Sequence, residues 1–542
     1  MTSADQPRNP PPRPLILPPY SHDPDSPGRR RARRWAVGLL AAFSFFWGLV
    51  FAFLAPALIL ILLAPVGILM LVAIWALPDL KTAPARLLRR MFLAYVAIAV
   101  LWPFYISIAI PHSGLPWIGP ARLIFTPMVI VFLICLAVSK DLRGQLAVAL
   151  KSQRLIPWLL AAFVIIQTYS VLLSDRFFAS LNKWVDAQFT WTCVFFIACY
   201  LFTRPGLVRR WATILWACAV IACLIALWEW RIQHVPWFGH LPAFLQMDPI
   251  MAKAVAPNFR NYTTVYRVRS TFQSALGLGE YMSLTIPFVL CFAFGPFGRK
   301  VRLAALASIP LICFVVFISH ARSGVIGVLI DFALYGFYWG VMQWRRDRAN
   351  PIGIAVLLSY PVVAALAVAS TFFIGRIHAS VWGSGETVSS TEARTVQYQM
   401  GIPKVLSHPW GYGIGRGADT LGFFTPGGLE TIDTYYLLIA LDYGVVGFLV
   451  FYSLILYSIY AAGRYSLKDH GHDRETLFLP AAGIALASFF VIKSVYSEVN
   501  NHSLYFMVLG MVVALIYRVK NAGPLSTGAP RNQTAPAAER LS

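Results

Sequence analysis

The chain has 542 residues, of which 58% are hydrophobic and 13% are charged. This composition excludes an ordinary water-soluble globule, because too few polar side chains are present to cover its surface, and it predicts an all-α polytopic membrane protein. The excess of 45 basic over 23 acidic residues, a net charge of +22, would also suit a nucleic-acid-binding protein, so the position of the charges must decide. All seven cysteines lie in apolar runs, which argues against a disulfide framework or a thiolate metal site.

The N-terminal segment 1–34 is rich in proline and ends in a cluster of arginines. It predicts a disordered, basic cytosolic tail. Residues 35–76 are apolar for long enough to cross a bilayer twice, so we do not expect a cleaved signal peptide. We expect residues 35–518 to form the membrane domain and the polar segment 519–542 to form a second disordered cytosolic tail.

Apolar runs of about 20 residues predict about 14 transmembrane helices. The predicted spans lie at 35–54, 57–76, 91–110, 122–138, 155–173, 189–202, 211–230, 280–295, 303–319, 324–341, 352–373, 434–460, 478–495 and 502–517. The first two share a tight turn near Pro56 and the sixth is short, so counts of 12 and 13 are alternatives.

Six connections between these runs each carry three or four basic residues. The positive-inside rule makes them cytosolic loops, and an even number of spans places both termini in the cytosol. On these boundaries the cytosolic segments hold 31 of the 45 basic and 10 of the 23 acidic residues, a net charge of +21. The basic balance is therefore interpreted as membrane topology. Two longer connections, at about 231–279 and 374–433, are expected on the outer face, where long loops are usually functional.

Arg322 stands between two apolar runs with almost no loop to carry it into water. A cation at this depth is usually paired, snorkelled or functional. It is either an interfacial anchor or a phosphate-binding group, for which the planar guanidinium is well suited. The first long loop offers Arg267 and Arg269, of which we expect Arg269 to face inward, and Glu280 follows at the start of the next span.

The second long loop contains Arg394 and the glycine-rich segment 407–417. Alternating glycines are typical of a phosphate-binding loop, but no Walker lysine or strand–helix unit surrounds them, and backbone turns explain them equally well. Arg394 and Arg416 are either phosphate ligands or solvated loop charges, and for Arg416 we favour the solvated charge.

Asp433 directly precedes an apolar run that begins at Thr434. It is the N-cap of a helix, a carboxylate that orients or deprotonates a hydroxyl group, or both at once, and partial burial would favour the second role by raising its pKa. Asp331 lies about two turns inside its span, where an acid should face the bundle interior and pair, and it has either a packing or folding role or a role in substrate binding. The outer histidines show no metal-ligand spacing, and no metal or other cofactor is expected.

The order of these motifs resembles that in the bacterial O-antigen ligase and Wzy-type polysaccharide polymerase superfamily. Matching segments are Arg322-Ser323-Gly324, Arg394, the His-Pro-x-x-Gly-x-Gly segment that starts at His408, and Asp433-Thr434 followed after nine residues by Gly444-x-x-Gly447. The resemblance covers about residues 265–460, and the N-terminal helices match only in hydropathy.

The resemblance implies a C-class (type B) glycosyltransferase-like membrane fold in the bacterial inner membrane. It implies a metal-independent, inverting glycosyltransferase whose donor is an oligosaccharide on undecaprenyl pyrophosphate. Arg322 and Arg394, with Arg269, would hold the pyrophosphate, while Asp433 would serve the acceptor hydroxyl. Further candidate site residues are Arg267, Glu280, His408, Arg416 and Thr434. The implied partners are lipid-linked oligosaccharide as donor and acceptor, membrane lipid, and a flippase and chain-length regulator of the same pathway, with no nucleic acid.

One departure from the family pattern affects the predicted reaction. Asp433 and Thr434 stand where ligases typically have His and Asn, and His502-Ser503 is no substitute because Val513 stands where the motif requires glycine. The acid favours a polymerase of the exopolysaccharide or O-antigen type. The nearest alternative is a ligase that transfers the glycan to lipid A core or to protein. A lipid-linked oligosaccharide flippase, which predicts mid-membrane ionisable residues and repeated halves, and a non-enzymatic scaffold are further alternatives.

Overall fold

The structure is a computed structural model, and it describes most of the predicted membrane domain. The described residues are 84–108, 119–242, 244–247, 266–349, 351–373, 387–424, 430–468 and 473–521. They all belong to one compact unit, formed by Val72–Ile110 and Pro116–Ser542. The N-terminal tail, the predicted spans at 35–54 and 57–76, and the C-terminal tail beyond Asn521 lie outside the described residues.

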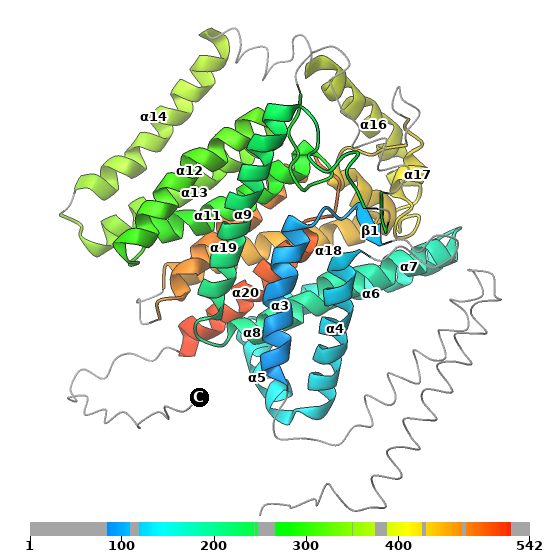
Figure 1. Cartoon of the computed structure of the whole chain (residues 1–542), viewed down its shortest axis with the longest axis horizontal. Coiled ribbons are helices and arrows are strands. Elements are labelled where there is room, and N and C mark those ends of the chain that lie inside the picture. Colours follow the sequence, from blue (N-terminus) through cyan, green and yellow to red (C-terminus); the bar gives the residue numbers. More distant parts are fainter. Residues whose placement is uncertain are drawn as a thin grey trace, which may run out of the picture. The chain divides into compact units, whose positions relative to one another are not determined.

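Helices dominate the described part of the chain, as Figure 1 shows. Those at predicted spans are α3 (Ala85–Leu101), α4 (Pro120–Val138), α6 (Leu155–Leu173), α8 (Val194–Phe202), α9 (Leu207–Ile232), α11 (Ala275–Phe294), α12 (Arg299–Ile318), α13 (Arg322–Arg346), α14 (Pro351–Phe373), α18 (Tyr435–Ser466), α19 (Leu479–Ile492) and α20 (His502–Asn521). Within the described residues, nine helical stretches are long and apolar enough to cross a membrane. This confirms a helical, multi-pass membrane protein, and the count of 14 stays a prediction.

The sixth predicted span, 189–202, is longer than the sequence indicated. Helix α7 (Phe177–Ala187) continues through a π-helical segment, η1 (Gln188–Cys193), into α8, so that Phe177–Phe202 forms one apolar stretch of 26 residues. Lys183 and Asp186 interrupt the apolar run, so hydropathy alone does not predict the first turns of this helix. A π-helical segment inside an α-helix often marks a functional site.

The third predicted span, 91–110, is wrong at its C-terminal end. Helix α3 ends at Leu101, and Pro103 cannot continue it because proline lacks a backbone N–H. Strand β1 (Ile106–Ile108) follows and pairs antiparallel with β2 (Leu245–Met247), which belongs to the first long loop. This ladder holds that loop against the end of α3.

Helices also occur where the sequence predicted loops. Helix α5 (Lys140–Ser152) lies in a predicted cytosolic loop, and the Ser139 hydroxyl caps it by accepting the N–H of Leu142 at 3.3 Å. Helices α16 (Thr387–Ser407) and α17 (Gly417–Leu421) lie in the second long loop, and a short 3-10 turn, η3 (Thr476–Phe478), precedes α19. The second long loop is therefore partly helical, and Arg394 is a helical residue.

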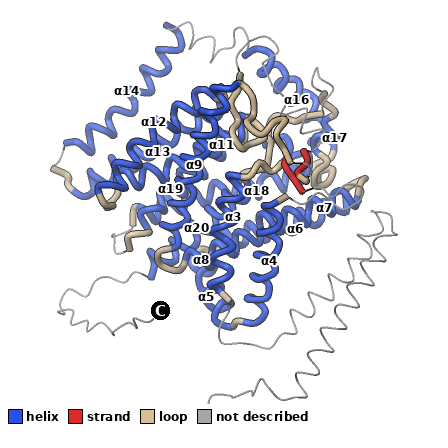
Figure 2. The backbone as a smooth tube through the Cα atoms, in the orientation of Figure 1, coloured by secondary structure: helices blue, strands red, loops and turns tan. Residues whose placement is uncertain are grey.

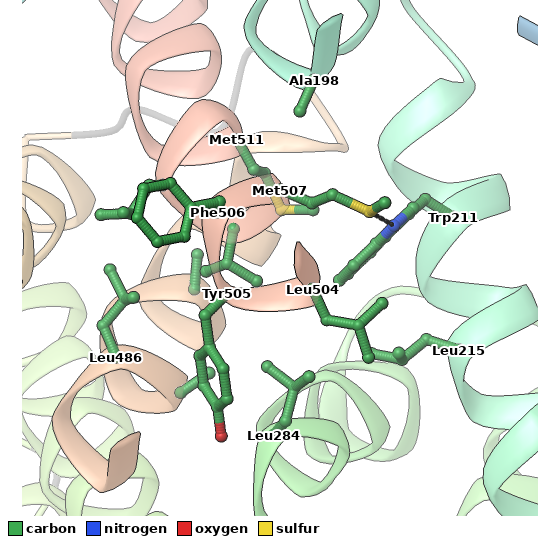
Figure 3. Packing of buried hydrophobic residues seen from close by; sticks show 14 of the residues in the cluster. Ala198, Trp211, Leu215, Leu284, Leu486, Leu504, Tyr505, Phe506, Met507 and Met511 are labelled. Atoms are coloured by element: carbon green, nitrogen blue, oxygen red, sulfur yellow. Dashed lines mark hydrogen bonds between the residues drawn. The ribbon is translucent and has the colours of Figure 1, made fainter. Parts of the chain in front are cut away.

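Two helices, α11 and α20, form the interior of the bundle. Nearly all of their side chains are buried, and α20 packs against α8, α19, α5 and α18. Figure 3 shows this packing around Leu504, Phe506 and Met507, where the indole N–H of Trp211 lies 3.3 Å from the Met507 sulfur. Because α11 and α20 are central, the residues at their N-terminal ends are held firmly.

Asp331 faces the bundle interior, as the sequence predicted. Its side chain on α13 is fully buried, and its carboxyl group accepts the hydroxyl of Ser283 on α11 at 2.7 Å. The other carboxyl oxygen has no hydrogen-bond partner among the described residues, so the bundle satisfies this acid only in part.

Helices α11 and α13 cross at a pair of glycines near their N-terminal ends. A Cβ atom added to Gly324 would lie 2.7 Å from the Cα of Gly279. Such contact distances do not occur between real side chains, so only glycine permits this crossing. The glycine of the Arg-Ser-Gly motif therefore brings the start of α13, and with it Arg322, against the start of α11.

We expect Gly324→Ala to destabilise the protein by about 1–3 kcal/mol, because the helices must separate to admit the methyl group. Gly463→Ala is the matched control, since Gly463 in α18 has open space around it and alanine favours a helix. The measurement is the thermal midpoint of the detergent-solubilised variants. A Gly324→Ala midpoint equal to that of Gly463→Ala would contradict the close crossing.

Candidate active site

Helices α11, α13, α18 and α20 begin at the same end of the bundle, which we call the loop end. The Asn501 amide donates to the Glu280 carboxylate at 2.9 Å and to the Gly277 carbonyl at 3.0 Å, which joins the starts of α20 and α11. The N–H of Tyr435 donates to the Lys493 carbonyl at 3.0 Å, which joins the start of α18 to the end of α19. Figure 2 shows loops gathered with the two short strands at this end.

Asp433 and Arg394 lie near each other at the loop end. The N–H of Asp433 donates to the side-chain oxygen of Gln397 at 2.8 Å, and Gln397 lies one turn after Arg394 on α16. Burial raises the pKa of Asp433 above its usual range, while the positive charge of Arg394 opposes that rise. Asp433 is not the helix cap: the Thr434 hydroxyl accepts the Leu437 N–H at 3.3 Å, so that alternative is wrong and Thr434 has the capping role.

Two buried donors face no acceptor beside Asp433. The Nε of Arg394 and the Nε2 of the fully buried Gln397 have no hydrogen-bond partner among the described residues. Buried polar groups are nearly always hydrogen-bonded, and an unsatisfied donor is costly. These two donors therefore indicate a place where a ligand supplies the acceptors. No local pattern singles out Gln397, a polar residue on the mixed helix α16.

The other three arginines lie around the starts of α11 and α13. The Nε of Arg267 contacts the Ser319 carbonyl at 3.5 Å, at the end of α12, and half-buried Arg322 opens α13 directly afterwards. Arg269 is only 4% exposed, which confirms that it is the inward residue of its pair, and it donates to the Gln273 carbonyl at 3.3 Å.

Glu229, near the end of α9, fixes the segment that carries Arg269. The buried carboxylate accepts the Tyr266 hydroxyl at 2.7 Å and the backbone N–H groups of Arg269 and Ser270 at 3.2 and 2.6 Å. Glu229 lies near the end of an apolar run, and nothing in the neighbouring sequence predicts that its partners lie in the first long loop.

Segment 493–501 connects the surroundings of Asp433 with the segment that carries Arg269, and sequence reasoning missed it. Lys493 forms a 2.8 Å ion pair with Glu280, and both side chains are fully buried. The Asn500 amide donates to Gln273 at 3.2 Å and to Glu498 at 3.0 Å, and the Ser497 hydroxyl donates to the Ile432 carbonyl. A lysine at the end of an apolar run was the available signal. Glu280 is thus a partner of Lys493.

The glycine-rich segment binds the protein's own carboxylate. Backbone N–H groups of Gly415, Arg416 and Gly417 donate to Asp442 at 3.0, 3.0 and 2.6 Å. Such consecutive N–H groups form an anion-binding nest, and here Asp442 of α18 occupies it. The backbone-turn alternative is therefore the correct one for these glycines.

The same segment is pinned to a break in α18. Gly444 has a left-handed φ of 71°, and a Cβ there would lie against the Pro409 carbonyl. The N–H of Val445 donates to this carbonyl at 2.9 Å, and the N–H of Tyr412 donates to the Leu441 carbonyl at 2.8 Å. The spacing between the His-Pro motif and the Gly-x-x-Gly motif thus reflects one packing contact.

Arg416 and His408 have partners other than the candidate site residues described above. Arg416 is buried, and its guanidinium contacts Asp175 at 2.7 Å and also Asp419, so the interpretation as a solvated charge is wrong. His408 is exposed, and its Nδ1 lies 2.8 Å from the Tyr412 hydroxyl within its own segment. Among the described residues, no three His, Cys, Asp or Glu side chains gather as a metal site.

A cavity of about 460 Å³ lies at the loop end, beside segment 493–501. Its wall includes Trp102 and Phe104 from the end of α3, Gln273, Asn500 and Asn501, and Lys183 of α7. Ile432, next to Asp433, also lines it. The cavity therefore lies beside Ile432, the chain neighbour of Asp433, and beside Gln273, whose carbonyl accepts a hydrogen bond from Arg269.

Comparison with known proteins bears on the part of the chain that carries these motifs. No curated protein sequence matches the chain. Residues 303–452 match the family model of O-antigen ligases. The matched segment contains Arg322, Arg394 and Asp433, and the family consists of glycosyltransferase-like enzymes that act on lipid-linked oligosaccharides. This match confirms the resemblance to the O-antigen ligase and Wzy-type polymerase superfamily over residues 303–452.

Proposed function

We propose that the protein is a polysaccharide polymerase that joins undecaprenyl-pyrophosphate-linked oligosaccharide repeat units at the periplasmic face of the inner membrane. The observation that carries this proposal is that the positive charge of Arg394 acts on the partly buried Asp433, beside two unsatisfied buried donors. A carboxylate and cationic donors side by side are what a transfer from a pyrophosphate leaving group to a hydroxyl group requires.

In the proposed reaction, an acceptor hydroxyl oxygen attacks the anomeric carbon of the donor sugar from the face opposite the pyrophosphate. The carbon–oxygen bond to pyrophosphate breaks as the new glycosidic bond forms, which inverts the configuration. The hydroxyl proton passes to the Asp433 carboxylate, and undecaprenyl pyrophosphate leaves with the bonding electron pair. Arg322, Arg394 and Arg269 stabilise the charge that develops on its oxygens, so the reaction needs no divalent ion.

Two features support polymerase over the alternatives. Asp433 stands in place of the ligase histidine, and burial raises its pKa toward the range of a general base. The intramembrane acid Asp331 accepts a hydrogen bond from Ser283 on a neighbouring helix. A single acid held in this way gives little support to a flippase with a mid-membrane polar path.

The decisive experiment incubates purified protein in lipid nanodiscs with an undecaprenyl-pyrophosphate-linked repeat unit and no other acceptor. A polymerase converts this single substrate into longer lipid-linked chains, which mass spectrometry resolves. A ligase leaves it unchanged until lipid A core or protein is added. A flippase moves it between leaflets without changing its length.

The pH dependence of chain extension tests the role of Asp433. A general base works only when deprotonated, so activity should fall as the pH drops through the pKa of Asp433. Removing the positive charge in Arg394→Gln raises that pKa further, and the acidic limb should move to higher pH by about one unit. Glu392→Gln, exposed on the same helix, should leave the limb in place. An unmoved limb in Arg394→Gln would exclude Asp433 as the titrating base.

A further inference from the structure

The cavity at the loop end has the chemistry of a sugar-binding site. A sugar ring presents apolar C–H faces and a rim of hydroxyl groups, so a site for it needs an aromatic surface together with groups that donate and accept hydrogen bonds. Aromatic side chains and side-chain amides supply these two properties. The volume of about 460 Å³ lies within the ordinary range for small-ligand pockets.

The aromatic surface comes from Trp102 and Phe104. The indole N–H of Trp102 donates to the Ile106 carbonyl at 2.9 Å, which fixes the ring plane, while the residue itself stays only half-buried. Phe104 is 43% exposed and lies beside it in the wall. The β1–β2 ladder that begins at Ile106 holds this platform in place.

The polar side of the wall comes from Gln273, Asn500 and Asn501. The Asn500 nitrogen donates to Gln273 and Glu498, so among the described residues its amide oxygen is the acceptor left for a ligand. The charged side chains of Lys183 and Asp186 also border the cavity. Much of the remaining wall is apolar, with Leu438, Ile439 and Val499 among its side chains, so the isoprenoid chain is the competing occupant that a binding experiment must distinguish.

We propose that this cavity binds the sugar rings of the lipid-linked oligosaccharide, stacked on Trp102 and hydrogen-bonded to Asn500 and Gln273. The inference rests on the proposed function, because the cavity adjoins Asp433 through Ile432 and Arg269 through Gln273. The arginines then recognise the pyrophosphate and the cavity recognises the glycan. Sugars of the donor and of the acceptor share this chemistry.

Three probes test the cavity by equilibrium binding to protein in nanodiscs. The first is undecaprenyl pyrophosphate without sugar. The second is the undecaprenyl-pyrophosphate oligosaccharide extracted from cells that lack this gene. The third is the same oligosaccharide freed from its carrier by mild acid. The variants are Trp102→Ala, Trp102→Phe and Asn500→Ala, with Trp228→Ala and Asn182→Ala, which change exposed residues outside the cavity, as matched controls.

We expect the wild type to bind the glycosylated carrier about tenfold more tightly than the bare carrier. Trp102→Ala and Asn500→Ala should remove most of this preference and leave the affinity for bare carrier unchanged, while Trp102→Phe retains part of it and the controls retain all of it. Trp102-dependent binding of the freed glycan would assign the cavity to the acceptor. If Trp102→Ala and Asn500→Ala lose the preference for glycosylated carrier and the freed glycan does not bind, the cavity is assigned to the sugars of the donor.

Three results would overturn the inference. If Trp102→Ala and Asn500→Ala keep the wild-type preference, or if the wild type has none, the cavity does not bind sugar and the proposed function still stands. If Trp102→Ala weakens binding of bare carrier equally, the occupant is the isoprenoid chain. If the wild type binds neither lipid, the proposed function fails together with the inference.

Discussion

Replacing Arg322 by alanine is expected to lower the turnover number of chain extension by about 10²–10³-fold, with little change in the Michaelis constant. Arg322 opens α13 at the point where Gly324 packs on Gly279, so its backbone is held against the start of α11. Its charge would act on the pyrophosphate as the leaving group departs. An interaction that strengthens only in the transition state affects turnover more than substrate binding.

Two further variants distinguish this role from a general effect of charge. Arg322→Lys keeps the charge and loses the planar fork of donors, and about a tenfold loss is expected. Arg231→Ala removes an exposed arginine at the end of α9 and should retain wild-type turnover. The rates are compared only among variants with the wild-type thermal midpoint. A wild-type turnover number in Arg322→Ala would reject the assignment and favour the interfacial anchor.

The hydrophobic runs predicted the membrane helices because burial in lipid is recorded locally in the sequence. Helices α4 and α6 begin and end within two residues of the predicted spans. Local patterning failed at Phe177–Ala187, where Lys183 and Asp186 interrupt the apolar run yet the helix continues. It also failed for α16, whose sequence is polar and lacks a continuous apolar face.

The site could be predicted only in part, because its contacts join distant segments. Motif order predicts Arg322, Arg394 and Asp433 as site residues, whereas Arg416 pairs with Asp175, which lies 241 positions away in the chain. No local spacing predicts such a pair. The same holds for Asp442 in the nest of the glycine-rich segment and for segment 493–501, whose Lys493 reaches Glu280 across the bundle.

Removing either partner of the Lys493–Glu280 pair is expected to cost about 3–5 kcal/mol of unfolding free energy, because the remaining charge is left buried and unpaired. The Lys493 ammonium also lies 4.6 Å from the Tyr496 ring centroid and 5.4 Å from that of Tyr435. These contacts add to the loss in Lys493→Met. The control is Arg176→Ala, which breaks a 3.5 Å pair with Asp419 at the surface and should cost about 0–1 kcal/mol.

The double variant Lys493→Met with Glu280→Gln separates the worth of the pair from the penalty for breaking it. With both charges gone, no unpaired ion remains, and most of the stability lost in either single variant should return. Denaturant titration of the four proteins in detergent gives the coupling energy, and additive losses would show that the two charges do not interact. Because Glu280 neutralises Lys493, this lysine adds no net charge for a pyrophosphate. A double variant with restored stability should therefore retain chain extension, whereas Arg322→Ala should not. Loss of activity in both would place Lys493 among the pyrophosphate ligands.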